Sequence, residues 1–300
     1  MKKMEEKSMD SHLLRPYNFL PKKELRSFLG QNFIIDPMFL RSTVRLARLQ
    51  SEDMVLEFGT GLGALTYYLA PVVRGVFTVE ISARLLKFAQ NFLKSYSNVY
   101  FCLADALRNK NSLNPAWIDA FGEVHSLSKP FVVVANLPYQ IASSLIVLLL
   151  RRHFEEAPFA LKRMLVLVQR EVGERFLAKP NQKNYGRLSV MVQSMAVVRR
   201  VKLAPPNIFW PRPRVMSALM EVIPRKGVEG GGLSYLDKLV RLAFTHRRKK
   251  LGFNLAPLAS SIRIQSLWEE VGIDPSQRPE EISVQKYLRL ALLWKKLEDG

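Results

Sequence analysis

The feature that most constrains the fold is a glycine-rich turn between a buried strand and a helix. Met54–Glu57 is a short apolar run typical of a buried strand, and Ala64–Ala70 has the pattern of a helix. The connection between them is Glu57-Phe58-Gly59-Thr60-Gly61-Leu62-Gly63-Ala64. Glycines permit a tight turn and let backbone N–H groups approach a ligand closely. The pattern predicts a nucleotide-binding strand–turn–helix unit, with an ordinary strand–helix turn as the alternative.

The same alternation of apolar runs and helical patterns continues along the chain. A helix is expected at Ile81–Lys94, and we expect further strands at Val76–Glu80, Val99–Leu103, Phe131–Ala135 and Met164–Val168. Continuous apolar strands separated by helices indicate a parallel sheet covered on both faces. Leu188–Val198 and Ser217–Ile223 are expected to add strands near the sheet edge. The predicted fold class is therefore doubly wound α/β.

Residues 224–232 interrupt this pattern. Their proline and clustered glycines indicate a linker, and residues 233–300 have helical periodicity without strand runs. Residues 1–20 are polar and lack the apolar segment of a secretory signal. We therefore predict a polar tail at 1–20, an α/β domain at 21–223, the linker at 224–232 and a small helical domain at 233–300.

The composition favours a polyanionic partner. The chain has 300 residues, with 45 Lys and Arg against 26 Asp and Glu, which gives a net charge of +19. A chain this basic usually binds nucleic acid, although a general solubility bias is the simpler explanation. Most of the excess charge lies before residue 224, so the main basic surface is expected there.

Cysteine, histidine and apolar patterns narrow the class of protein further. Cys102 is the single cysteine, so no disulfide can form within the chain, which suits a reducing cytoplasm. The four histidines lack ligand spacing, and we expect no metal site. The longest apolar stretch, Ile141–Leu150, is too short to cross a bilayer, so we expect no association with a membrane.

The second and third predicted strands end in acidic residues. Glu80 closes the second strand, where a carboxylate can accept hydrogen bonds from both hydroxyls of a ribose. Asp105 follows the third strand and can accept from an adenine amino group, while Ala106 and Leu107 flank the ring. Each acid also fits a helix cap. Together with Gly59 and Gly61, they predict a site for an adenosine-bearing cofactor, either S-adenosylmethionine or NAD.

The fourth predicted strand is followed by Asn136-Leu137-Pro138-Tyr139. This sequence fits methylation of an aromatic amine, whose lone pair is delocalised into its ring. The Asn136 side-chain oxygen and a backbone carbonyl at Leu137 or Pro138 can accept the two amine hydrogens and direct the lone pair at a methyl group. Tyr139 offers an aromatic face to an extruded base. The alternative is a simple turn with a core tyrosine.

A stiff, proline-rich loop supplies a second candidate aromatic. In Phe209-Trp210-Pro211-Arg212-Pro213-Arg214 the prolines restrict the backbone and can hold Phe209 against the other face of the base. Arg212 and Arg214 are then expected to contact phosphates. A core phenylalanine in a rigid loop is the competing interpretation of Phe209.

These segments together resemble the KsgA family of small-subunit ribosomal RNA adenine dimethyltransferases. The resemblance extends from about residue 28 to the C-terminus. Six stretches match in order: Gly30–Ile34, Leu56–Gly63, Val79-Glu80, Ala104-Asp105, Asn136–Tyr139 and Phe209–Ser217. Three more are similar: Val168–Arg175, Tyr185–Val190 and Phe244–Leu251.

The resemblance implies a Rossmann-like S-adenosylmethionine methyltransferase fold with a small helical C-terminal domain that docks on RNA or the ribosome. It implies that Asn32 and Ile34 contact the cofactor, and that Arg247-Arg248-Lys249-Lys250 faces phosphates. The implied product is dimethyladenine at two adjacent adenines near the 3′ end of small-subunit ribosomal RNA. We expect a cytoplasmic monomer that acts in small-subunit maturation, within a pre-assembled subunit.

Three features depart from the family pattern. The segment 106–130 is longer than the family usually has and is expected to be a surface loop. Met216 stands where an acidic residue is common, and Gly252-Phe253 replaces a more polar pair. These departures leave the methyl-transfer residues intact and concern RNA docking.

Other activities remain as alternatives. A resistance-type methyltransferase of large-subunit RNA has the same fold and chemistry, but the Phe244–Leu251 and Gln169–Arg175 stretches favour the small-subunit enzyme. A non-catalytic RNA-binding assembly or transcription factor is disfavoured by the intact Asn136–Tyr139 stretch. No proton relay accompanies the glycine loop, as a dehydrogenase requires. No His-x-Glu with Pro-Cys-x-x-Cys occurs, as a zinc deaminase requires.

Overall fold

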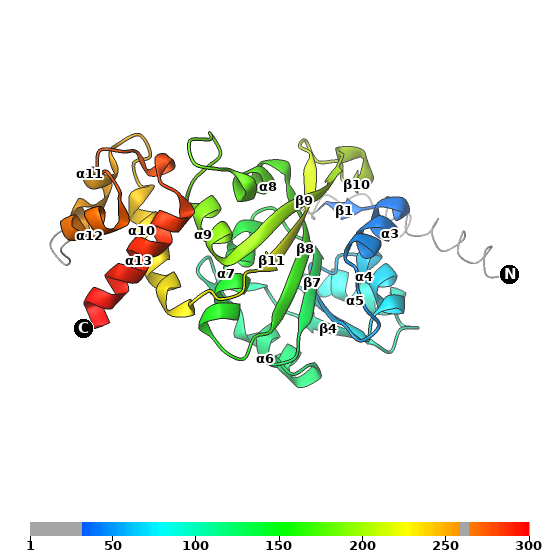
Figure 1. Ribbon diagram of the computed structural model, residues 1–300. Helices are drawn as coiled ribbons and strands as arrows, with labels where there is room; N and C mark the ends of the chain where they lie inside the picture. Colours follow the sequence, from blue (N-terminus) through cyan, green and yellow to red (C-terminus); the bar gives the residue numbers. More distant parts are fainter. Residues whose placement is uncertain (1–31, 259–263, 300) are drawn as a thin grey trace.

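A seven-stranded sheet forms the centre of the computed structural model, which describes residues 32–258 and 264–299 (Figure 1). The predicted tail at 1–20 lies outside the described residues. The strand order is β4-β3-β2-β7-β8-β11-β9, with the first five strands parallel and β11 antiparallel to both of its neighbours. This arrangement confirms the predicted α/β fold. The strands are β2 (Met54–Phe58), β3 (Gly75–Glu80), β4 (Val99–Leu103), β7 (Phe131–Asn136), β8 (Leu161–Gln169), β9 (Ala196–Ala204) and β11 (Ser217–Pro224).

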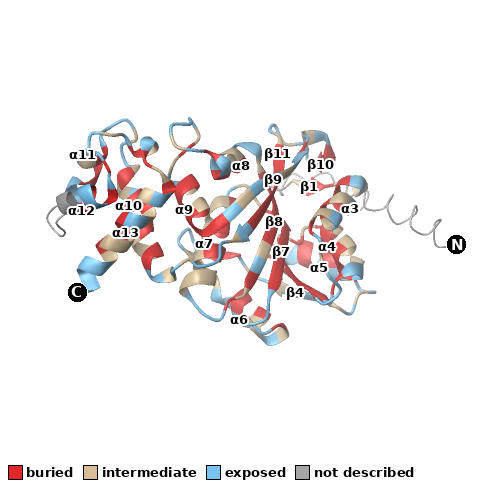
Figure 2. Cartoon of the chain, in the orientation of Figure 1, coloured by how far each residue is buried: buried red, intermediate tan, exposed pale blue. Residues whose placement is uncertain are grey.

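The central strands are buried and mostly apolar because helices cover both faces of the sheet (Figure 2). Val55 and Val132 point into one hydrophobic cluster, and their neighbours Leu56 and Val133 point into another. The first cluster includes side chains of α3 (Pro37–Leu46), α4 (Ala64–Leu69) and α5 (Ala83–Phe92). The second includes side chains of α6 (Pro115–Val124), α7 (Ala142–Glu155), α8 (Arg170–Leu177) and α9 (Arg187–Met195).

The strand order reverses at β2, which lies between β3 and β7. Ligands of open α/β sheets bind at such a switch point, beyond the carboxyl ends of the strands. Local capping directs the helices that follow. Ser82 caps α5 by accepting from the N–H of Leu85 at 3.4 Å, so the chain turns into a helix directly after β3.

The prediction of a surface loop at 106–130 is wrong. It contains a small hairpin of β5 (Leu107–Asn109) and β6 (Ser112–Leu113), followed by α6. Trp117 and Phe121 of α6 are fully buried against the sheet. The helix begins with Asn114 as its N-cap and Pro115 in its first turn. This Asn-Pro pair is a helix start signal, but the polar residues before it favour a loop in the sequence pattern.

The prediction of a strand at Leu188–Val198 is wrong for its first part. Residues 187–195 form α9, and the strand β9 begins at Ala196. Six of the nine residues of α9 are buried, because the helix lies between the sheet and the C-terminal helices. A helix that is buried on nearly all sides loses the amphipathic period that distinguishes it from a buried strand.

The C-terminal part is helical, with α10 (Leu233–Ala243), α11 (Leu251–Leu255), α12 (Ile264–Val271) and α13 (Val284–Asp299). Leu236, Leu239 and Tyr287 belong to the same hydrophobic cluster as the buried residues of α7 and α9. The C-terminal helices therefore pack onto the α/β part through one continuous apolar contact (Figure 1).

The predicted linker 224–232 connects β11 to α10 through a short 3-10 turn, η4 (Gly230–Gly232). A Cβ built on Gly230 would lie 2.0 Å from the carbonyl oxygen of Phe154, at the end of α7. A Cβ on Gly232 would lie 2.7 Å from Leu292 of α13. The glycines therefore allow the backbone of this segment to pack closely against α7 and α13, so the segment is a packed turn and not a flexible spacer.

Two short strands form a separate pair beside the main sheet. β1 (Phe33–Ile34) and β10 (Phe209–Trp210) are antiparallel, with Phe33 opposite Trp210 and Ile34 opposite Phe209. This pair brings the start of the described chain to the proline-rich loop. No helix in the described ranges is long and apolar enough to cross a membrane.

Candidate active site

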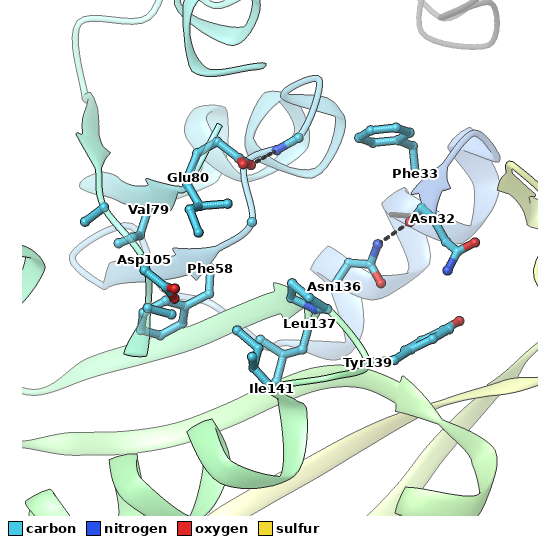
Figure 3. A pocket seen from close by; sticks show the side chains of 16 residues that line it. Asn32, Phe33, Phe58, Val79, Glu80, Asp105, Asn136, Leu137, Tyr139 and Ile141 are labelled. Atoms are coloured by element: carbon cyan, nitrogen blue, oxygen red, sulfur yellow. Dashed lines mark hydrogen bonds between the residues drawn. The ribbon is translucent and has the colours of Figure 1, made fainter. Parts of the chain in front are cut away.

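A pocket with about 700 Å³ of space lies at the carboxyl ends of β2, β3, β4 and β7 (Figure 3). This is the switch point of the sheet, where open α/β folds bind their ligands. Most of the site residues predicted from the sequence meet here. The lining residues are Asn32, Phe33, Phe58, Gly59, Gly61, Val79, Glu80, Ile81, Ala104, Asp105, Ala106, Asn136, Leu137, Pro138, Tyr139 and Ile141.

The glycine loop holds Glu80 in place. Gly59 and Gly61 have φ angles of +84° and +56°, which side chains disfavour. The N–H of Gly61 donates to Glu80 Oε2 at 2.9 Å, and the N–H of Ser82 donates to Oε1 at 2.9 Å. A carboxylate has about four acceptor positions, so Glu80 keeps acceptor capacity for two ribose hydroxyls. Glu80 is 3% exposed, and the loop has therefore fixed its orientation before any ligand binds.

Asp105 lines the same pocket from the end of β4, the strand next to β3. Its Oδ1 accepts from the N–H of Leu107 at 3.0 Å, which leaves Oδ2 without a hydrogen bond to the described residues. Oδ2 can therefore accept from the amino group of an adenine. Phe58, Val79 and Ala106 are buried and supply apolar walls. The donor and acceptor set thus fits an adenosine-bearing cofactor, with the ribose at Glu80 and the base near Asp105.

Asn136 is oriented by a hydrogen bond to the start of the described chain. Its Nδ2 donates to the carbonyl oxygen of Asn32 at 2.8 Å (Figure 3). This bond assigns the amide orientation and leaves Oδ1 as an acceptor in the pocket. The carbonyl of Pro138 already accepts from the N–H groups of Ile141 and Ala142, both at 3.1 Å. Of the two carbonyls left open by the sequence, that of Leu137 is therefore the better second acceptor.

Tyr139 lies at the edge of the pocket with its hydroxyl anchored. The hydroxyl forms a 2.7 Å hydrogen bond with Ser217, the first residue of β11. Burial raises the pKa of Tyr139, so the phenol stays neutral. The anchored ring can stack on a base without rotating away. Nothing in the local sequence indicates this contact of Ser217, although the residue closes the Phe209–Ser217 stretch.

Three residues predicted to contact the cofactor or the base do not line the pocket. Leu107 is 8% exposed and packs in the cluster on the α6–α9 face of the sheet. Ile34 and Phe209 are 6% and 2% exposed, and both pack in the hydrophobic cluster on one face of the sheet. They face each other in the β1–β10 pair, where Phe33 does line the pocket and stacks on Trp210 with ring centroids 6.4 Å apart. In this conformation Phe209 lies beside Ile34 in the core, outside the pocket.

A buried carboxylate beneath the glycine loop was also missed. Glu57 is 1% exposed and accepts hydrogen bonds from Thr66 at 2.6 Å and Thr78 at 2.7 Å. The Thr78 hydroxyl also bonds to that of Thr60 in the loop, at 2.6 Å. Burial raises the pKa of Glu57 to about 7. A glutamate inside an otherwise apolar strand is the signal that marks it in the sequence.

The predicted phosphate contacts lie apart from one another. Arg212 and Arg214 are exposed in the loop after β10. Arg247 donates to the carbonyls of Lys183 and Gln182, at 2.6 and 3.2 Å. Arg248, Lys249 and Lys250 are exposed in the turn between α10 and α11. Within the part of the chain that the structure describes, no three His, Cys, Asp or Glu residues are grouped as metal ligands.

The sheet order and the pocket define a class, the S-adenosylmethionine-dependent methyltransferases. A family model described as ribosomal RNA adenine dimethylase matches residues 22–296. The chain belongs to this family, as the resemblance of its motifs predicts.

Relatives in sequence and structure agree with this assignment. The chain is 34% identical over 286 residues to the ribosomal RNA small subunit methyltransferase A of Bacillus mycoides, which covers 93% of each chain. It superposes on a dimethyladenosine transferase from Plasmodium falciparum with a TM-score of 0.70 and 24% identity, covering 87% of this chain and 96% of that one. The corresponding values for the 23S rRNA methyltransferase ErmE are 0.60, 25%, 87% and 98%.

Proposed function

We propose that the chain transfers methyl groups from S-adenosylmethionine to the exocyclic amines of two adjacent adenines near the 3′ end of small-subunit ribosomal RNA, giving dimethyladenine. The observation that carries the chemistry is the fixed amide of Asn136. Its Nδ2 is held by Asn32, so its Oδ1 is presented to the pocket as an acceptor. The family and the small-subunit name of the Bacillus relatives support the substrate.

The residues act mainly by placement. Glu80 and Asp105 bind the ribose and adenine of the cofactor, which supplies a methyl group bonded to a sulfonium. Asn136 Oδ1 and the Leu137 carbonyl accept the two hydrogens of the target amine, and this geometry aims its lone pair at the methyl group. Tyr139 stacks on the extruded base. A monomethylated amine still has one hydrogen to donate, so the same residues can hold it for a second transfer.

The large-subunit alternative has the same pocket chemistry, so the test must compare substrates. Labelled methyl transfer is measured on unmethylated small ribosomal subunits and, in parallel, on protein-free large-subunit RNA, followed by nucleoside analysis. We expect label in the small subunits, as dimethyladenine at adjacent positions near the 3′ end. Label in the large-subunit RNA alone would establish the resistance-type activity instead.

Asn136→Ala tests the mechanism in the same assay. We expect a loss of about 100-fold or more in turnover, comparable to removing one transition-state hydrogen bond at other sites, with cofactor affinity retained in calorimetry. Asn207→Ala removes an exposed asparagine outside the pocket and serves as the control. Wild-type turnover in Asn136→Ala would disprove the role of its side chain. Cofactor binding without label on either RNA would favour a non-catalytic assembly factor.

The place of action is part of the same proposal. We infer a monomer that works in the cytoplasm on assembled small subunits during their maturation. The net charge of +19 supports an RNA partner, and Arg212, Arg214 and the exposed residues of the 247–250 turn are the candidate phosphate contacts.

A further inference from the structure

A wide basic groove lies between α7, α9 and α10, where the α/β part meets the C-terminal helices. It has about 1520 Å³ of open space and is separate from the candidate active site. Seven basic side chains line it against two acidic ones, Glu171 and Asp237. The basic residues are Lys110, Arg151, Arg175, Lys183, Arg187, Arg241 and Arg247.

Three of these arginines surround one buried carboxylate. Asp237 of α10 accepts from Arg187 at 2.7 Å and from Arg241 at 3.0 Å. Arg151 of α7 lies 4.0 Å from the same carboxylate and also pairs with Glu155, one turn further along its helix, at 2.9 Å. The three arginines come from α7, α9 and α10, so the cluster forms only when these helices are packed together.

Asp237 remains ionised in this environment. Burial alone would raise the pKa of Asp237, but hydrogen bonds and charges of Arg187 and Arg241 outweigh burial and lower it. The side chain of Asp237 is 12% exposed, whereas those of Arg187 and Arg241 are 45% and 54% exposed. The carboxylate is thus beneath the arginines, and the guanidinium groups face the groove.

One aspartate occupies only a small part of this donor capacity. A guanidinium has five N–H donors in a planar fork that matches phosphate oxygens. Arg187 uses two of its nitrogens on Asp237, and Arg241 uses one. Arg151 uses two of its nitrogens on Glu155. The hydrogen bonds to Asp237 hold the guanidinium groups of Arg187 and Arg241 in place, so a ligand does not pay the entropy of ordering them. Their remaining N–H donors and a net positive charge are available to that ligand.

The groove is linked to the candidate active site by α7. Ile141, which precedes this helix, lines the active-site pocket, and Ser143, Ser144 and Arg151 on the helix line the groove. A helix rises about 1.5 Å per residue, so Arg151 lies about 15 Å along the axis from Ile141. A phosphate bound at the arginines would therefore lie outside the nucleotide that carries the extruded adenine.

We propose that Arg187 and Arg241, oriented by Asp237, and Arg151, oriented by Glu155, form a binding site for a backbone phosphate of the substrate RNA outside the target nucleotide. This inference rests on the proposed function for the identity of the RNA. It adds contacts distinct from Arg212, Arg214 and the 247–250 turn. The site holds the RNA where α7 begins at the methyl-transfer pocket, so flanking backbone and target base are fixed by one helix.

The test is the salt dependence of RNA binding, with a stem-loop RNA that carries two adjacent unpaired adenines as the probe. Each lost phosphate contact lowers the slope of log Kobs against log salt by about 0.7–0.9. We expect a decrease of this size for Arg241→Gln and about twice as much for Arg187→Gln with Arg241→Gln. Lys238→Gln removes one exposed charge from the same helix outside the groove and is the matched control.

Thermal unfolding and cofactor calorimetry of every variant separate an RNA contact from a structural ion pair. Lower melting temperatures with the wild-type salt slope would mean that the arginines only hold α9 to α10, and would overturn the proposal. An equal slope change in Lys238→Gln would also overturn it, since the effect would be one of overall charge. Wild-type methyl transfer to small subunits tests the proposed function independently, because the slope is measured without turnover.

Discussion

At the scale of single residues, the glycine loop depends on a carboxyl group that lies outside the pocket. Glu57 connects Thr66 of α4 with Thr78 of β3, and Thr78 continues the connection to Thr60 in the loop. The network fixes the turn from below, while Glu80 fixes it from the pocket side. A buried polar network is favourable only when every member is satisfied. The protonation of Glu57 should therefore influence the stability of the whole unit.

The raised pKa of Glu57 predicts a pH-dependent stability. Unfolded glutamate ionises near pH 4.5, whereas folded Glu57 keeps its proton up to about pH 7. The folded state thus binds one more proton in this window, and the free energy of unfolding falls as pH rises through it, by about 1.4 kcal/mol per unit. Glu57→Gln should remove this contribution. In urea unfolding, wild type should lose about 2–3 kcal/mol relative to Glu57→Gln between pH 5 and pH 8; parallel profiles would contradict a raised pKa.

Glu80 supports a second prediction at this scale, on cofactor affinity. Glu80→Ala removes the acceptor proposed for the ribose hydroxyls, and a charge-assisted hydrogen bond is worth about 1.5–3 kcal/mol. We expect binding of S-adenosylmethionine to weaken at least about 10-fold in calorimetry. Glu52→Ala, an exposed glutamate outside the pocket, should bind as wild type does. An unchanged dissociation constant in Glu80→Ala would remove this residue from the site. If the wild-type protein bound NAD more tightly than S-adenosylmethionine, the result would favour a dehydrogenase.

At the scale of elements, the sequence predicts what local pattern and strand ends determine. Each of the five parallel strands is a short apolar run followed by a turn signal, so their positions can be predicted from the sequence. Because parallel strands end at the same edge of a sheet, the sequence also predicts that Glu80, Asp105 and Asn136 lie together there. Contacts between distant segments had no such signal. The Asn136–Asn32 bond joins residues 104 positions apart, and the Tyr139–Ser217 bond joins residues 78 apart. The position of Phe209 outside the pocket likewise depends on the β1–β10 pair, which is long-range.

The turn η4 supplies a prediction for an element that periodicity cannot describe. In Gly230→Ala the new Cβ would lie 2.0 Å from the Phe154 carbonyl, a backbone atom that cannot rotate away. We expect a loss of about 1–3 kcal/mol in the free energy of unfolding. Gly122→Ala, inside α6, is the matched control, because the new Cβ would lie at an ordinary contact distance of 3.9 Å from Leu127. We expect this change to stabilise the protein by up to about 1 kcal/mol. Equal effects of the two changes would mean that η4 shifts freely.

At the scale of the whole molecule, one apolar cluster connects the α/β part with the C-terminal helices, and one basic groove is lined by residues of both. Tyr185, at the start of the Tyr185–Val190 stretch, is fully buried, and its hydroxyl donates to the carbonyl of Ile282 at 2.8 Å. Arg247 similarly ties the turn after α10 to the loop at 182–183. Arg247, which the resemblance implies as a phosphate contact, thus also helps to hold the C-terminal helices in position. Arg247 is bonded to neighbouring backbone, whereas Arg248, Lys249 and Lys250 are exposed, so the two groups must be tested separately.

That division gives the last prediction. Replacing Arg248, Lys249 and Lys250 with Ala removes three exposed charges, so the slope of RNA affinity against salt should fall by up to about 2, with cofactor affinity unchanged. Arg247→Ala should instead lower the melting temperature, because two carbonyls and the nearby Glu280 lose their partner. Alanine at the exposed lysines 87, 94 and 129 controls for net charge. A slope unchanged in the triple variant would show that the turn is only a solvated surface, and an equal fall in the control would show that total charge alone governs RNA binding.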